Sequence, residues 1–268
     1  MSETIMYDKF FNQTIDLFQQ FEEVDAIVLG GSRTTGKHDL ESDYDVYVYL
    51  NRELNTEKRR SALAQTCKYM EINNTYWERE DDCILSNGIN IDFIYRTIED
   101  MTQSLVNTLE NHNAQCGYTT CICHNIFTSQ VLFDPKGLFS EMVKRFTMPY
   151  PEPLRENIIL KNRELLEGKI PSYLHQIEKA VKRNDVISIN HRMTEFLASF
   201  FDILFALNRT FHPGEKRLIE LSNALCKYLP VDFESDMHSL FVVNEKEEVI
   251  PVMRKLISNL DDLIKKYK

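Results

Sequence analysis

Strand-forming segments are confined to the first half of this chain, and this asymmetry constrains its fold more than any other feature. A short apolar run at 26–29 ends at two glycines, and residues 43–50 and 89–95 alternate apolar with polar side chains. Amphipathic helical spacing occupies 6–21 and 57–71. This order predicts an α+β domain with a mixed sheet and flanking helices.

The segment before the last of these strands is less regular. Residues 74–80 predict a further strand, and 81–88 predict a connection that ends in the turn-forming pair Asn87-Gly88. Helical stretches around 99–112 and 118–131 are expected to close the domain.

Beyond residue 138 the apolar residues follow helical spacing throughout. Residues 187–209 predict a long helix that is apolar enough to form the centre of a bundle. Three prolines between 149 and 153 mark a connector. We therefore predict two domains, a sheet-containing domain at 1–137 and an all-α helical bundle at 138–268.

The composition argues against several classes of protein. The net charge is −10, and the basic residues are interleaved with acidic ones, which argues against nucleic acid as the main partner. No run of about 18 apolar residues is present, so no membrane span is expected. The N-terminus lacks the basic and apolar regions of a signal peptide. The six cysteines are therefore expected to stay reduced, which favours a cytoplasmic location.

Cysteine spacing raises the question of a zinc site at Cys116, Cys121, Cys123 and His124. Structural zinc sites usually take paired ligands with two to four residues between them. Here Cys123 and His124 are adjacent and no second pair follows, so free cysteines are the favoured interpretation.

Three aspartates carry the strongest chemical signal. Residues two apart on a strand point to the same face, so Asp43 and Asp45 should present two carboxylates side by side. Such carboxylates repel each other unless a cation lies between them, and Mg²⁺ is the natural choice. Asp92 lies on the polar face of a later strand and would join them if the strands pair. Three carboxylates could hold two metal ions for an in-line displacement.

The loop before these aspartates suits a phosphate. Gly30 and Gly31 let the backbone approach an anion closely, and Ser32 adds a hydroxyl donor. Each feature alone is weak: the glycines could form an ordinary turn and the aspartates could be solvated. Found together and in this order, they favour a phosphate and metal site.

This succession resembles the nucleotidyltransferase superfamily of DNA polymerase β-like folds. The resemblance rests on a strand, Gly30-Gly31-Ser32-Arg33, nine intervening residues, Asp43-Tyr44-Asp45 and the later strand with Asp92. The small-molecule branch, which includes antibiotic nucleotidyltransferases, is the nearer likeness. Residues 190–230 resemble the helical domain of an uncharacterised bacterial group within this superfamily.

The resemblance implies a role for each matched position. Gly30, Gly31 and Ser32 would hold the phosphates of ATP or another nucleoside triphosphate. Asp43 and Asp45 would bind Mg²⁺. Asp92 would either complete the metal site or deprotonate the acceptor hydroxyl. Lys216 would contact the triphosphate from the helical domain, and Arg33 would either pair with a phosphate or pack nearby.

The expected reaction is transfer of a nucleoside monophosphate to a small-molecule hydroxyl, with release of pyrophosphate. An aminoglycoside- or lincosamide-like acceptor is one interpretation, and a protein hydroxyl is another. A catalytically inactive nucleotide-binding regulator or toxin-neutralising partner is the alternative from a different class.

Four further positions have open roles. Glu195 and Asp202 share one face of the apolar helix, where they either serve the acceptor site or pair with a nearby arginine. Tyr76 and Trp77 either line an acceptor pocket or pack in the core.

Overall fold

The computed structural model describes residues 8–34, 42–242 and 248–267. The predicted loop between Arg33 and Asp43 falls partly on 35–41, outside these ranges. By their internal contacts, the residues form two compact units, one from 1–105 with 125–147 and one from 106–124 with 148–268. The division into domains at 1–137 and 138–268 stays a prediction.

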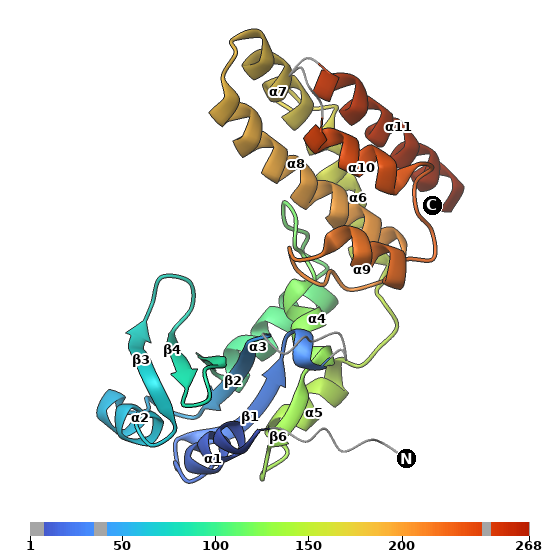
Figure 1. The fold of residues 1–268 in the computed structure, drawn as a ribbon. Helices are drawn as coiled ribbons and strands as arrows, with labels where there is room; N and C mark the ends of the chain where they lie inside the picture. Colours follow the sequence, from blue (N-terminus) through green and yellow to red (C-terminus); the bar gives the residue numbers. More distant parts are fainter. Residues whose placement is uncertain (1–7, 35–41, 243–247, 268) are drawn as a thin grey trace. The chain divides into compact units, whose positions relative to one another are not determined.

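The first unit contains a six-stranded mixed sheet (Figure 1). The strand order is β3-β4-β5-β2-β1-β6. Only β2 and β5 pair in parallel, and every other neighbouring pair is antiparallel. The strands are β1 (Val24–Gly30), β2 (Tyr44–Leu50), β3 (Cys67–Asn74), β4 (Glu80–Leu85), β5 (Asn90–Arg96) and β6 (Gln130–Phe133).

Two helices of the first unit, α1 (Lys9–Phe18) and α2 (Thr56–Leu63), pack in the apolar cluster on one face of this sheet. Helix α1 begins after Asp8, whose Oδ1 accepts hydrogen bonds from the backbone N–H groups of Phe10 and Phe11. Phe18 of α1 stacks on Phe93 of β5, with ring centroids 4.6 Å apart. The helical segments described in this unit are α1 (Lys9–Phe18), η1 (Ser32–Thr34), α2 (Thr56–Leu63), α3 (Ile98–Leu105) and α5 (Leu138–Phe146).

Alternation in β2 and β5 separates the core from the opposite face, as predicted. Val46 and Val48 of β2 and Phe93 of β5 are buried in one apolar cluster with α1. The residues between them turn to the other face, because successive side chains of a strand alternate. That second face carries Asp45 and Asp92.

Three local predictions in this unit are wrong. The helix expected over 57–71 ends at Leu63, and β3 begins at Cys67. Residues 75–79 form the loop of a hairpin rather than a strand, and the predicted connection at 81–88 contains most of β4. The strand was missed because the acidic composition of residues 78–82 is typical of a solvated segment. Likewise, the helix expected to run to 131 ends at Thr128 and is followed by β6.

The second unit is helical in the ranges that the structure describes, which confirms the predicted α+β class with a C-terminal bundle. Helix α8 (Val186–Leu207) is its apolar centre, with Phe196, Phe200 and Phe205 fully buried. The other helices that the structure describes around it are α6 (Glu152–Leu166), α7 (Tyr173–Lys182), α9 (Leu218–Leu225), α10 (Phe233–Val242) and α11 (Val249–Tyr267).

The segment 106–124 joins the second unit through polar contacts. It opens with a π-helical turn, η2 (Val106–Glu110), and ends within α4 (Cys121–Thr128). Side chains of α6 bind its backbone carbonyls: Asn157 donates to His112 O at 2.9 Å and Lys161 to Ala114 O at 2.7 Å. These contacts explain why this stretch leaves the sheet unit, which no local pattern indicated.

Among the helices described, none has the length and apolar character that a bilayer crossing requires.

Candidate active site

Strand β1 ends in two glycines whose backbone lies directly against the acidic face. Gly31 has φ +69°, a conformation that glycine adopts readily. A Cβ built at Gly31 would lie 1.8 Å from Oδ2 of Asp45, and one at Gly30 would lie 2.6 Å from the Tyr47 ring. The glycines therefore allow the loop backbone to contact the Asp45 carboxylate.

The strand register places carboxylates in one row across the sheet. Asp45 of β2 pairs with Gly30 of β1 on one side and with Asp92 of β5 on the other. Asp92 in turn pairs with Asp82 of β4. Paired residues on neighbouring strands project to the same face and lie about 5 Å apart. The predicted meeting of Asp45 with Asp92 is thus confirmed.

Burial and the neighbouring carboxylates of this row oppose ionisation of Asp92. Burial, followed by the charges of Asp82 and Asp45, raises the pKa of Asp92 to about 7. Asp43, which immediately precedes β2 and is exposed, adds to the same effect. A cation bound at this face would relieve this repulsion, so the donor set suits a hard ion such as Mg²⁺.

The Arg33 side chain binds the backbone immediately before β2. Its Nε donates to the carbonyl oxygens of Ser42, at 2.8 Å, and Asp43, at 3.2 Å, and Nη2 also binds Ser42 O. The guanidinium lies 3.9 Å from the ring centroid of Tyr44. The Tyr44 hydroxyl donates to Asp8, the residue that caps α1. Arg33 therefore fixes the backbone at Asp43.

Comparison with known proteins identifies the family of this sheet unit. Residues 12–108 match the family described as Polymerase beta, Nucleotidyltransferase. The chain contains a polymerase β-type nucleotidyltransferase domain. Residues 119–218 match a second family, described as Domain of unknown function (DUF4037). No curated protein matches the chain in sequence.

Two solved structures illustrate the range of the likeness. A nucleotidyltransferase-like protein from Exiguobacterium sibiricum 255-15 has 12% identity and a TM-score of 0.43, over 94% of this chain and 72% of that one. An aminoglycoside 6-adenyltransferase from Bacillus subtilis has 12% identity and a TM-score of 0.33, over 98% of this chain and 93% of that one. The assignment of the nucleotidyltransferase domain rests on the family match.

The metal-binding roles of Asp43, Asp45 and Asp92 stay predictions. Within residues 8–34, 42–242 and 248–267, no three His, Cys, Asp or Glu side chains converge closely enough to form a preformed metal site. The register nevertheless brings two of the three predicted ligands side by side.

Two of the predicted phosphate contacts also stay predictions. Ser32 begins the short helix η1 directly after Gly31, but its side chain lies outside the described part of the structure. Lys216 is exposed and belongs to the second unit, two residues before α9.

Sequence reasoning missed the acidic residues of the β3–β4 hairpin. Asp82 pairs with Asp92 and accepts a hydrogen bond of 2.7 Å from the Asn74 side chain. Glu71 of β3 pairs with Asp82 and extends the row by one strand. The alternation of Asp81, Cys83 and Leu85, all buried, was the available signal for β4.

The structure excludes one of the roles that we considered for Tyr76, Trp77 and Asp202. Tyr76 and Trp77 are each 88% exposed in the β3–β4 loop, so core packing is excluded for both. Asp202 is buried and accepts hydrogen bonds from Thr119 N and Oγ1, at 3.0 and 2.7 Å, and from Asn162. Its partners are thus neutral groups within the second unit, and not the arginines that we considered.

Cys121, which we considered as a zinc ligand and expected to be a free cysteine, contacts a histidine of the same unit. Cys121 Sγ lies 3.4 Å from Nδ1 of His212, and the backbone N–H of Gly214 donates to the same nitrogen at 3.1 Å. Burial lowers the pKa of His212 to about 3 and raises the pKa of the Cys121 thiol. The pair is therefore neutral at physiological pH, unlike the thiolate–imidazolium pair of a nucleophilic cysteine.

Proposed function

We propose that this protein transfers a nucleoside monophosphate, AMP in the first instance, from a nucleoside triphosphate to a hydroxyl of a small-molecule acceptor. The observation that supports this most is the row Gly30, Asp45, Asp92, with the Gly31 backbone against the Asp45 carboxylate. A phosphate site and a carboxylate pair then lie within one strand spacing of each other.

The proposal assigns the phosphates to the β1 end of the row. Gly31 is exposed there, directly after the buried Gly30, with the dipoles of a loop that follows a strand. Ser32 would donate its hydroxyl and Lys216 its ammonium group. Arg33 would position the backbone at Asp43, to which it is hydrogen-bonded. Direct contact of Arg33 with a phosphate is the second possibility.

Asp43 and Asp45 would hold Mg²⁺, with Asp92 as the third carboxylate. When bound, the metal neutralises charge on the phosphate oxygens and activates the α-phosphorus toward attack. Asp92 lies one strand further from the glycines, so in this proposal it would face the acceptor. In that position it would either complete the metal site or take the proton of the attacking hydroxyl.

The acceptor would lie over β4 and β3. Asp82 and Glu71 continue the acidic row there. Such a surface favours an acceptor that carries positive charge as well as hydroxyl groups, as aminoglycoside- or lincosamide-like compounds do. Exposed Tyr76 and Trp77, in the loop of the same hairpin, offer aromatic surface to a sugar ring. We place the enzyme in the cytoplasm, because its six cysteines are free.

The test is release of pyrophosphate with Mg²⁺ and each of the four nucleoside triphosphates, against a panel of hydroxylated acceptors. Asp45→Asn should lower turnover by at least about 100-fold while the unfolding temperature hardly changes. Asp16→Asn, on the exposed side of α1, is the matched control and should leave turnover unchanged.

Each result has a distinct meaning. Acceptor-dependent release that Asp45→Asn abolishes would establish the enzyme and name its acceptor class. Binding of nucleotide without release against any small molecule would favour a protein acceptor or a binding role. Retained turnover in Asp45→Asn would refute the proposed site.

A further inference from the structure

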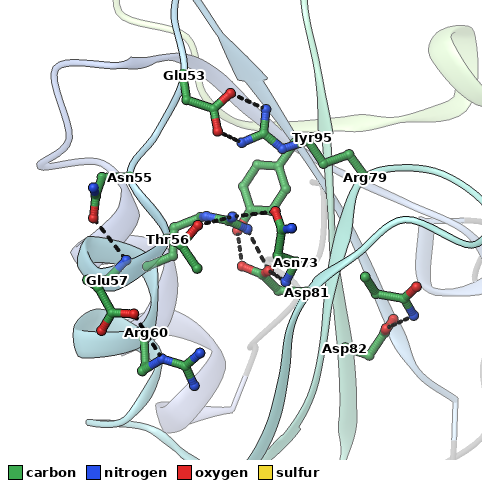
Figure 2. A network of polar contacts seen from close by, with 12 residues as sticks. Glu53, Asn55, Thr56, Glu57, Arg60, Asn73, Arg79, Asp81, Asp82 and Tyr95 are labelled. Carbon is green, nitrogen blue, oxygen red and sulfur yellow. Dashed lines mark hydrogen bonds and ion pairs between the residues drawn. The ribbon is translucent and has the colours of Figure 1, made fainter.

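A charged cluster around Asp81 lies inside the core of the first unit (Figure 2). It lies on the opposite face of the sheet from the acidic row, because Asp81 and Asp82 are successive residues of β4. Arg59 of α2 and Asp81 of β4 are both fully buried, with Nη1 and Oδ1 2.5 Å apart. The Tyr95 hydroxyl, from β5, donates to Oδ2 of Asp81 at 2.7 Å. The backbone N–H of Asn73, at the end of β3, donates to Oδ1 at 2.7 Å.

This cluster joins four elements through one carboxylate. Arg59 also donates to the side-chain oxygens of Thr56 and Asn73, at 3.3 and 3.2 Å, and its guanidinium lies 4.6 Å from the Tyr95 ring centroid. Helix α2 and strands β3, β4 and β5 therefore all meet at Asp81.

Stability alone does not account for such a cluster. Removing two charges from water costs free energy that their attraction only partly offsets, and apolar residues of similar volume often serve as well or better. Arg59 Nε is moreover buried with no hydrogen-bond partner among the residues that the structure describes. Buried ionic groups can instead serve specificity, by fixing an arrangement that apolar residues at the same positions would leave open.

The arrangement in question is the register of β4, which decides whether Asp81 or Asp82 faces the core. Asp81 points inward and Asp82 outward, toward Asp92. A shift of one residue would exchange them, because successive side chains of a strand alternate. The apolar residues of β4 do not forbid the shift, since Cys83, Ile84 and Leu85 are consecutive and apolar.

The turn and the strand pairing next to β4 fix its register at only one of its ends. The turn at Asn87-Gly88 fixes the end of β4 near β5, where Gly88 N donates to Leu85 O at 2.8 Å. At the other end, β4 leads to the loop 75–79, and the pairing of β3 with β4 shifts in register at two places. A bulge between the turn and Asp82 would therefore turn Asp82 into the core.

We propose that Arg59 and Tyr95 are positioning residues of the active site. By holding the Asp81 carboxylate in the core, they keep Asp82 on the opposite face, beside Asp92. The consequence for turnover rests on the proposed nucleotidyl transfer, whereas the consequence for the strand register does not.

The experiment replaces the cluster as a whole, so that no charge is left buried alone. The triple variant Arg59→Met, Asp81→Leu, Tyr95→Phe should unfold at a midpoint equal to or above that of the wild type. Its β4 amides should give more than one set of nuclear magnetic resonance signals, with weakened cross-strand contacts between residues 82 and 92. Turnover should fall by at least about tenfold. Arg60→Met, on the same helix but in an exposed pair with Glu57, should change none of these.

A single set of β4 signals with the native contact between residues 82 and 92 would overturn the proposal. Absence of turnover in the wild type would refute the proposed function only, because the resonance readout would still decide the register. If the triple variant does not fold, Tyr95→Phe keeps the proposal testable. Hydrogen exchange should then rise about tenfold, the effect of one lost hydrogen bond, at β4 amides alone. An unchanged rate, or an equal rise across the whole sheet, would count against the idea.

Discussion

Gly31→Ala offers a sharp test of the link between the phosphate loop and the carboxylates. The new Cβ would lie 1.8 Å from Oδ2 of Asp45, so the carboxylate has to move by about 1.6 Å to reach the 3.4 Å of ordinary contact. Misplacing a reacting group by about 1 Å can cost roughly 100-fold in rate. A loss of this size corresponds to about 2.7 kcal/mol in the barrier.

The substitution also strains the backbone, and a second glycine separates the two effects. Gly137, in the same unit, has the same φ of +69°, but a Cβ there meets nothing within 4 Å. Alanine in this conformation costs about 1–2 kcal/mol, which lowers the unfolding temperature by roughly 2–8 °C. Gly137→Ala should show this destabilisation with full activity.

The assay is pyrophosphate release under saturating Mg²⁺, alongside thermal unfolding of both variants. The expected result is a loss of at least about 100-fold in kcat/KM for Gly31→Ala relative to Gly137→Ala. Activity of Gly31→Ala within about threefold of the control would show that the position of the Asp45 carboxylate does not limit the reaction, which would refute the reasoning.

The other predictions test the electrostatics and the remaining contacts. Asp92→Asn should flatten the pH dependence of the free energy of unfolding in metal-free buffer. The pKa of Asp92 is about 7 in the folded protein and near 4 in the unfolded chain, so ionising Asp92 lowers stability as the pH rises between these values. Urea titrations at pH 5 and pH 8 measure the difference. Asp202, whose pKa burial also raises to about 7, should give the same sign in the second unit when replaced by Asn; a slope as steep as in the wild type would contradict this. Arg33→Ala should lower kcat/KM by about tenfold or more through the freed backbone at Asp43, with a small change in unfolding temperature, and wild-type kinetics would speak against that role. Lys216→Ala should raise KM for the nucleoside triphosphate by about tenfold and leave the unfolding temperature unchanged because the side chain is exposed; an unaltered KM would remove Lys216 from the site.

Sequence reasoning succeeded where a local pattern records burial on one face. The alternation of residues 43–50 and 89–95 correctly separated the core-facing residues from Asp45 and Asp92. The apolar helix over 187–209 likewise became the centre of the bundle as α8. In these segments a single partner surface determines the side chains, so their periodicity is enough to predict them.

It failed where a strand is held by distant charged partners. Asp81 occupies a core position, where Arg59 and Tyr95, 22 and 14 residues away, bind its carboxylate. Without those partners the run at 78–82 has the composition of a solvated segment. Asp82 was therefore missed as a member of the acidic row.

The sequence by itself determined the fold class, the family resemblance and the identity of the carboxylates on β2 and β5. Only the tertiary structure decided which strands pair, and so which acidic residues stand beside Asp92. It also decided that residues 106–124 belong with the helices, through a hydrogen bond from Thr119 to Asp202, 83 residues away. The physical reason is that periodicity reports only which face of an element is buried, whereas the partner of that face depends on charges and hydrogen bonds brought together from distant parts of the chain.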